Sequence, residues 1–114
     1  MQGDLWTYRE TVVLRGGDIT GFAVRATDGD IGKVDEATEE AGRNWIVVDT
    51  GPWIFGKKVM LPAGTIESID FDARTVFVGR TKDEIRAAPE FDPSVSREPA
   101  YQEELQTYYG TWYG

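Results

Sequence analysis

The sequence predicts a mainly β domain: a small β-barrel of about six strands, a short helical turn after it and a C-terminal amphipathic helix. Three observations lead to this fold class. Short apolar segments alternate with turn-forming residues between positions 21 and 78, an arrangement typical of small barrels and sandwiches. No long helical pattern lies among these segments. Apolar residues recur at helical spacing in the tail, after residue 100.

Six segments are expected to form strands because each combines β-favouring apolar residues with turn residues at its ends. Residues 45–48 (WIVV) form the strongest of them, since they are apolar on both faces. Asp28-Gly29 favours a tight turn between the first two strands. The last two strands flank residues 72–74 and form a hairpin. The expected strands are residues 21–27, 31–38, 45–48, 57–61, 65–71 and 75–78.

Two helical segments are expected after the strands. Thr81 and Glu84 have the spacing of a capping box, so a helical turn over residues 82–88 should begin there and end before Pro89. Ser96 is expected to cap the tail helix, and Gly110 to end it. The apolar stripe of this helix consists of Tyr101, Leu105, Tyr108, Tyr109 and Trp112.

Composition limits the chemistry that the chain supports. Its 114 residues allow one domain, with 20 acidic and 12 basic side chains and a net charge of −8. The sequence has no histidine and no cysteine, which excludes disulfides, a thiolate nucleophile, an imidazole base and a Cys/His zinc site. We therefore expect no cofactor, no metal site and no enzymatic activity. The acidity disfavours nucleic acid as a partner.

The chain divides into three parts by composition. Residues 1–16 form a lead-in, residues 17–89 carry the strand signals, and residues 90–114 form an acidic, aromatic tail. The last 33 residues hold three basic and seven acidic side chains, which is half of the net charge. No signal peptide and no membrane span is expected, so a cytoplasmic location is the expectation.

Seven short motifs follow one another between Asp18 and Pro89: ITGFAV at 19–24, DGDIGKVD at 28–35, WIVVD at 45–49, VMLP at 59–62, IESID at 66–70, TKDEI at 81–85 and AP at 88–89. In this order and spacing they resemble the PRC-barrel family. The resemblance implies a small β-barrel that serves as an assembly module in a stand-alone bacterial protein. The family includes the cytoplasmic domain of the photosynthetic reaction-centre H subunit and the C-terminal domain of the ribosome-maturation factor RimM.

Two groups of apolar residues are candidates for an interface. The first lies in the connection before residue 57 and either covers one barrel end or forms an exposed contact patch. The second is the tail stripe, which packs either on its own barrel or on a second subunit or partner. The candidate interface residues are Trp53, Ile54, Phe55, Tyr101, Leu105, Tyr108, Tyr109 and Trp112.

These features predict a non-enzymatic interaction or assembly module that self-associates, with a homodimer as the expected form. Its cellular role is left unassigned by the sequence. Two alternatives stay open. The first is an RNA- or ribosome-maturation-associated factor that uses Lys57 and Lys58 beside the aromatic residues Trp53 and Phe55. The second is a small-ligand-binding protein or enzyme with a deep pocket and perturbed carboxylates.

Overall fold

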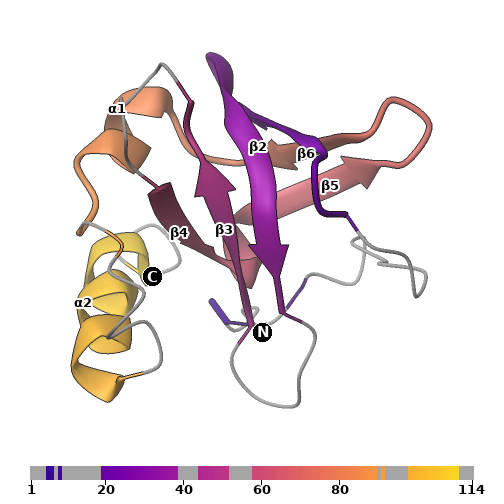
Figure 1. Cartoon of the computed structure of the whole chain (residues 1–114). Coiled ribbons are helices and arrows are strands. Elements are labelled where there is room, and N and C mark those ends of the chain that lie inside the picture. The colour runs from indigo at the N-terminus through magenta and orange to yellow at the C-terminus, as the bar shows by residue number, and fades with distance from the viewer. Residues whose placement is uncertain are drawn as a thin grey trace.

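The computed structural model describes residues 5–6, 8, 19–38, 44–51, 58–89, 91 and 98–110. These residues form one six-stranded sheet, a 3-10 turn and two helices, which confirms the predicted mainly β fold (Figure 1). The elements are β1 (Ala23–Ala26), β2 (Gly29–Ala37), β3 (Trp45–Asp49), β4 (Lys58–Pro62), η1 (Ala63–Thr65), β5 (Ile66–Asp70), β6 (Thr75–Val78), α1 (Lys82–Arg86) and α2 (Pro99–Gly110).

The sheet has the strand order β4-β3-β2-β1-β6-β5. Neighbouring strands pair antiparallel, as the predicted turns require, except that β1 and β6 pair in parallel. β5 and β6 run across the direction of β2 and β3, so the sheet curves around its core like a barrel (Figure 1). The hydrogen bonds of the described residues leave β4 and β5 as the two edges, and the barrel is not closed between them.

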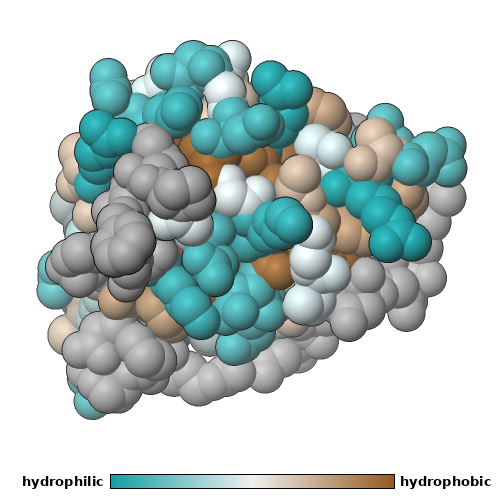
Figure 2. Space-filling model, turned by 45° about the horizontal axis from the view of Figure 1, so that its top comes forward, coloured by the Kyte–Doolittle hydropathy of each residue, from teal (hydrophilic) through white to brown (hydrophobic). Residues whose placement is uncertain are grey.

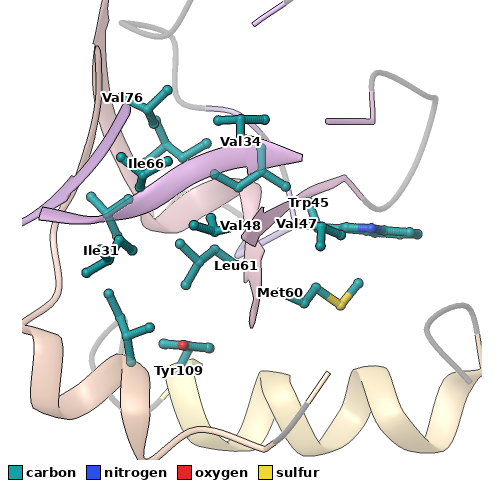
Figure 3. Close-up of a cluster of buried hydrophobic side chains, with 14 of the residues drawn as sticks. Ile31, Val34, Trp45, Val47, Val48, Met60, Leu61, Ile66, Val76 and Tyr109 are labelled. Carbon is teal, nitrogen blue, oxygen red and sulfur yellow. The ribbon is translucent and has the colours of Figure 1, made fainter. Parts of the chain in front are cut away.

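Aliphatic side chains fill the concave, inner face of the sheet. Alternate residues of the strands point there, among them Val24, Val34, Val48 and Val76, each at most 2% exposed. On β3 the outward-pointing residues are buried as well, since all four residues from Trp45 to Val48 are buried. This confirms the prediction that β3 is apolar on both faces. Figure 3 shows side chains from β2, β3, β4 and β6 converging in one cluster.

Gly32 permits a close contact between β2 and β3. Its φ of +143° lies in a region that L-residues rarely adopt. A Cβ atom added there would lie 2.0 Å from the backbone oxygen of Asp49, which is far inside van der Waals contact. The register of β1 against β2 shifts beside this residue, between Val24 and Arg25, as expected for a bulge. Only glycine fits this position without moving the backbone.

The helix signals of the sequence are confirmed in α1. The Thr81 hydroxyl accepts a hydrogen bond from the Glu84 backbone N–H, and the Glu84 side chain accepts one from the Thr81 N–H. The helix ends at Arg86, two residues before the predicted end, and a turn leads on to Pro89. α2 begins at Pro99, and the predicted cap Ser96 lies outside the described residues.

Candidate interaction surface

The apolar stripe of α2 faces the core of its own chain. Tyr101 is 6% exposed, and Leu105 and Tyr109 are fully buried. Tyr109 belongs to the same hydrophobic cluster as Ile31 and Leu61 of the sheet (Figure 3). Of the two placements that the sequence left open, the structure thus has the helix packed in cis.

The docked helix is also tied to the N-terminal lead-in. The indole N–H of Trp6 donates a hydrogen bond to the side-chain oxygen of Gln106, at 3.1 Å. The Trp6 ring packs edge-on against Trp45, with 6.4 Å between ring centroids. Backbone N–H groups of Asn44 and Gly64 donate to the lead-in at 2.8 and 2.6 Å. Residues near both ends of the chain therefore pack together beside β3, a role for the lead-in that the sequence did not reveal.

A cluster of tyrosines joins α2 to α1. The Tyr108 hydroxyl donates a hydrogen bond to the backbone carbonyl of Glu84. Burial, followed by the charge of Glu84, raises the pKa of Tyr108. Burial also raises the pKa of Tyr109, against the lowering influence of the nearby Arg80 charge. The hydrogen bond from the Tyr108 hydroxyl to the Glu84 carbonyl therefore links α2 to α1.

A shallow groove runs along the outer side of α2. Its volume is about 640 Å³. The helix contributes residues spaced at i, i+3, i+4, i+7 and i+8, so they form one continuous side of α2. Pro89, at the end of the turn that follows α1, also lines the groove. The lining residues are Pro89, Ala100, Glu103, Glu104, Thr107 and Tyr108.

Among the described residues, the outward-facing side chains of β1, β6 and β5 are more exposed than those of β3. Phe77 of β6 is 37% exposed, and among the described residues it is the one large hydrophobic side chain classed as exposed. It pairs with Arg25 of β1 on one side and with Ser68 of β5 on the other. Arg25 lies 3.3 Å from the carboxylate of Asp30. This region, which we call the Phe77 face, combines an apolar side chain with charges of both signs.

Acidic residues surround the lysine at the start of β4. The Lys58 ammonium lies 2.9 Å from the Asp35 carboxylate. The hydrogen bond and charge of Asp35 raise the pKa of Lys58, and Asp49 and Glu36 add to the effect. Within the part of the chain that the structure describes, no three carboxylates gather as a metal site. The face in Figure 2 carries mostly hydrophilic residues, with hydrophobic residues visible in gaps between them.

The structure separates the candidate interface residues into three groups. Tyr101, Leu105 and Tyr109 are inside the fold, and Tyr108 is half-buried at the edge of the groove. Trp53, Ile54, Phe55 and Trp112 lie outside the described residues, so their place in an interface stays a prediction. Phe77 was not among the candidates, although the alternation of Val76 and Val78 already places it on the opposite face.

No helix among the described residues is long and apolar enough to cross a membrane. No protein-family model matches the sequence, and no curated protein matches it. Among solved structures, the chain is similar to a Pseudomonas aeruginosa protein described as the 16S ribosomal RNA processing protein RimM. The two are 23% identical with a TM-score of 0.48 over 57% of this chain and 42% of that chain. The chain thus spans less than half of that protein's length, and the likeness concerns the fold alone.

Proposed function

We propose that this chain contains a PRC-barrel domain that acts as a non-enzymatic interaction module and self-associates. The observation that carries the proposal is the exposed Phe77 face. Trp45, Val47 and Met60 point outward from β3 and β4 and are buried in the fold, whereas Phe77 of β6 is 37% exposed. Aromatic residues provide much of the binding energy in protein interfaces.

The inside of the sheet gives a second reason to place the function on the surface. The inner face is filled by aliphatic residues such as Ile46, Leu61 and Val76, all fully buried. A ligand-binding protein or enzyme would instead need a concave pocket with converging polar groups. The groove beside α2 is shallow and lies on the outside of the molecule, away from this interior.

The Phe77 face suits contact with a second copy of the chain. A two-fold interface brings the same surface together from both subunits, so it must be complementary to itself. Arg25 and Asp30 supply opposite charges beside the apolar ring of Phe77. β5 lies next to this face and forms one edge of the sheet, where backbone groups can pair with another strand. The connection with Trp53, Ile54 and Phe55 remains part of the proposed interface.

The RNA alternative is less well supported by the surroundings of Lys58. Phosphate contacts need cations that are available to the nucleic acid. Lys58 is held by Asp35, with Asp49 and Glu36 nearby, so the local potential repels phosphate. Lys57 lies outside the described residues.

Molecular mass in solution tests the proposal. We expect light scattering to detect a dimer. The fraction of dimer should increase as salt rises from about 20 to 300 mM, because salt screens the repulsion between two copies of charge −8. Phe77→Glu should give monomers. Thr107→Glu adds the same charge at an exposed site on α2 and should leave the mass unchanged. A monomeric wild type at both salt concentrations would refute self-association.

A further inference from the structure

We propose that the groove beside α2 binds a basic segment of a partner protein, with arginine or lysine side chains contacting Glu103 and Glu104. This surface is separate from the Phe77 face, so the inference goes beyond self-association. It would let one subunit contact a copy of itself and a different protein at the same time.

The groove has the size and the lining of a peptide site. Its volume is about 640 Å³, and it is broad and open to solvent, as a site for an extended peptide segment needs to be. Pro89 and Ala100 supply apolar contact, and the Tyr108 ring lines the same groove. A peptide side chain can therefore lay its aliphatic part on these surfaces and extend its charged end to the rim.

The rim of the groove carries negative charge that no described residue neutralises. Glu103 and Glu104 are both exposed, and no hydrogen bond or ion pair joins either of them to another described residue. The sequence of α2 contains no basic residue. A second copy of the chain would bring its own charge of −8, so the occupant favoured by charge complementarity is a basic segment of another protein.

The groove is held in shape before any partner arrives. Leu105 and Tyr109 anchor α2 in the core on its buried side. The Tyr108 hydroxyl is bonded to the Glu84 carbonyl, which fixes the ring at the edge of the groove. A cation placed over this ring gains a cation–π contact, and arginine can also bond a carboxylate in a bidentate manner. A preformed site loses little entropy on binding.

Fluorescence anisotropy with two peptides tests this inference. The probe is a labelled peptide in which arginines alternate with leucines, and its control replaces each arginine by neutral citrulline. We expect the arginine peptide to bind, with affinity that falls as salt rises, and the citrulline peptide to bind at least about tenfold more weakly. The double variant Glu103→Gln/Glu104→Gln should lose about tenfold in affinity for the arginine peptide.

A matched control removes the same charge elsewhere. Asp70→Asn/Asp72→Asn changes the turn after β5 and keeps the Asp70 oxygen that accepts the Ala73 N–H at 3.0 Å. Its affinity for the arginine peptide should stay near that of the wild type. Equal losses in both double variants, or equal binding of the citrulline peptide, would overturn the inference. A fall in dimeric mass in the Glu103→Gln/Glu104→Gln variant, with peptide binding unchanged, would instead assign the groove to a second copy and overturn it too.

The tests of the two proposals can fail separately. Peptide binding should weaken with salt, whereas self-association should strengthen. Phe77→Glu should abolish the dimer and leave peptide affinity unchanged, because the Phe77 face does not line the groove.

Discussion

Replacing Leu105 by alanine tests whether α2 is part of the folded core. Leu105 is fully buried, so the change removes three carbon groups from a packed site. At about 0.8 kcal/mol per group, the transfer loss is about 2.4 kcal/mol, and the cavity left behind brings the range for such changes to about 2–5 kcal/mol. We expect a loss of about 3 kcal/mol in the free energy of unfolding, a large share of the 5–15 kcal/mol typical of a domain.

Urea denaturation, followed by tryptophan fluorescence at several protein concentrations, measures this loss. Thr107→Ala is the matched control, because Thr107 is exposed on the same helix and surface changes of this kind shift stability by at most about 0.5 kcal/mol. The Leu105→Ala loss should be independent of protein concentration. A loss no larger than that of the control would refute the docking of α2. A loss that shrinks as concentration rises would show that the helix packs in trans.

Two further predictions concern the backbone and the pH dependence. Gly32→Ala should destabilise the protein more than Gly51→Ala in thermal melts. Both glycines have a positive φ, which is unfavourable for alanine. An added Cβ would meet the Asp49 oxygen at Gly32 and has open space at Gly51, so equal shifts would contradict the close approach of β2 and β3. Stability should also fall as pH rises above about 10. In the folded state burial raises the pKa of Tyr108, and the ion pair with Asp35 raises the pKa of Lys58. The unfolded chain therefore loses these two protons at a lower pH than the folded protein does. Tyr108→Phe should make this fall shallower in urea titrations from pH 8 to 11, and a stability that rises with alkaline pH would contradict the assignment.

The strands and the first helix could be predicted because their signals are local. The apolar alternation of residues 75–78 and the capping box of Thr81 and Glu84 depend on neighbours a few positions away. All expected strand ends fell within two residues of the observed ones, and the largest differences, of two residues, are at the starts of β1 and β2. Such patterns identify the apolar face of a strand or helix from the spacing of its own residues alone.

The arrangement of these elements could not be predicted in the same way. The parallel pairing of β1 with β6 joins residues about fifty positions apart, and no turn between them indicates it. Trp6 lies in the core because Trp45 and Gln106 are brought to it by the fold. For the same reason, the sequence showed the apolar stripe of α2 but not which surface it would cover.

The ribosome makes α2 after all six strands, so the sheet is complete before the helix can pack against it. The last strand of the sheet ends at Val78, and α2 ends at Gly110. At about 5–20 residues per second, a ribosome needs about 2–6 s to make the intervening residues. During that time the nascent sheet lacks the apolar contacts of Leu105 and Tyr109, which are buried in the core of the folded protein. A chaperone or an early partner that recognises apolar β-surface would have this interval in which to bind, before the helix arrives.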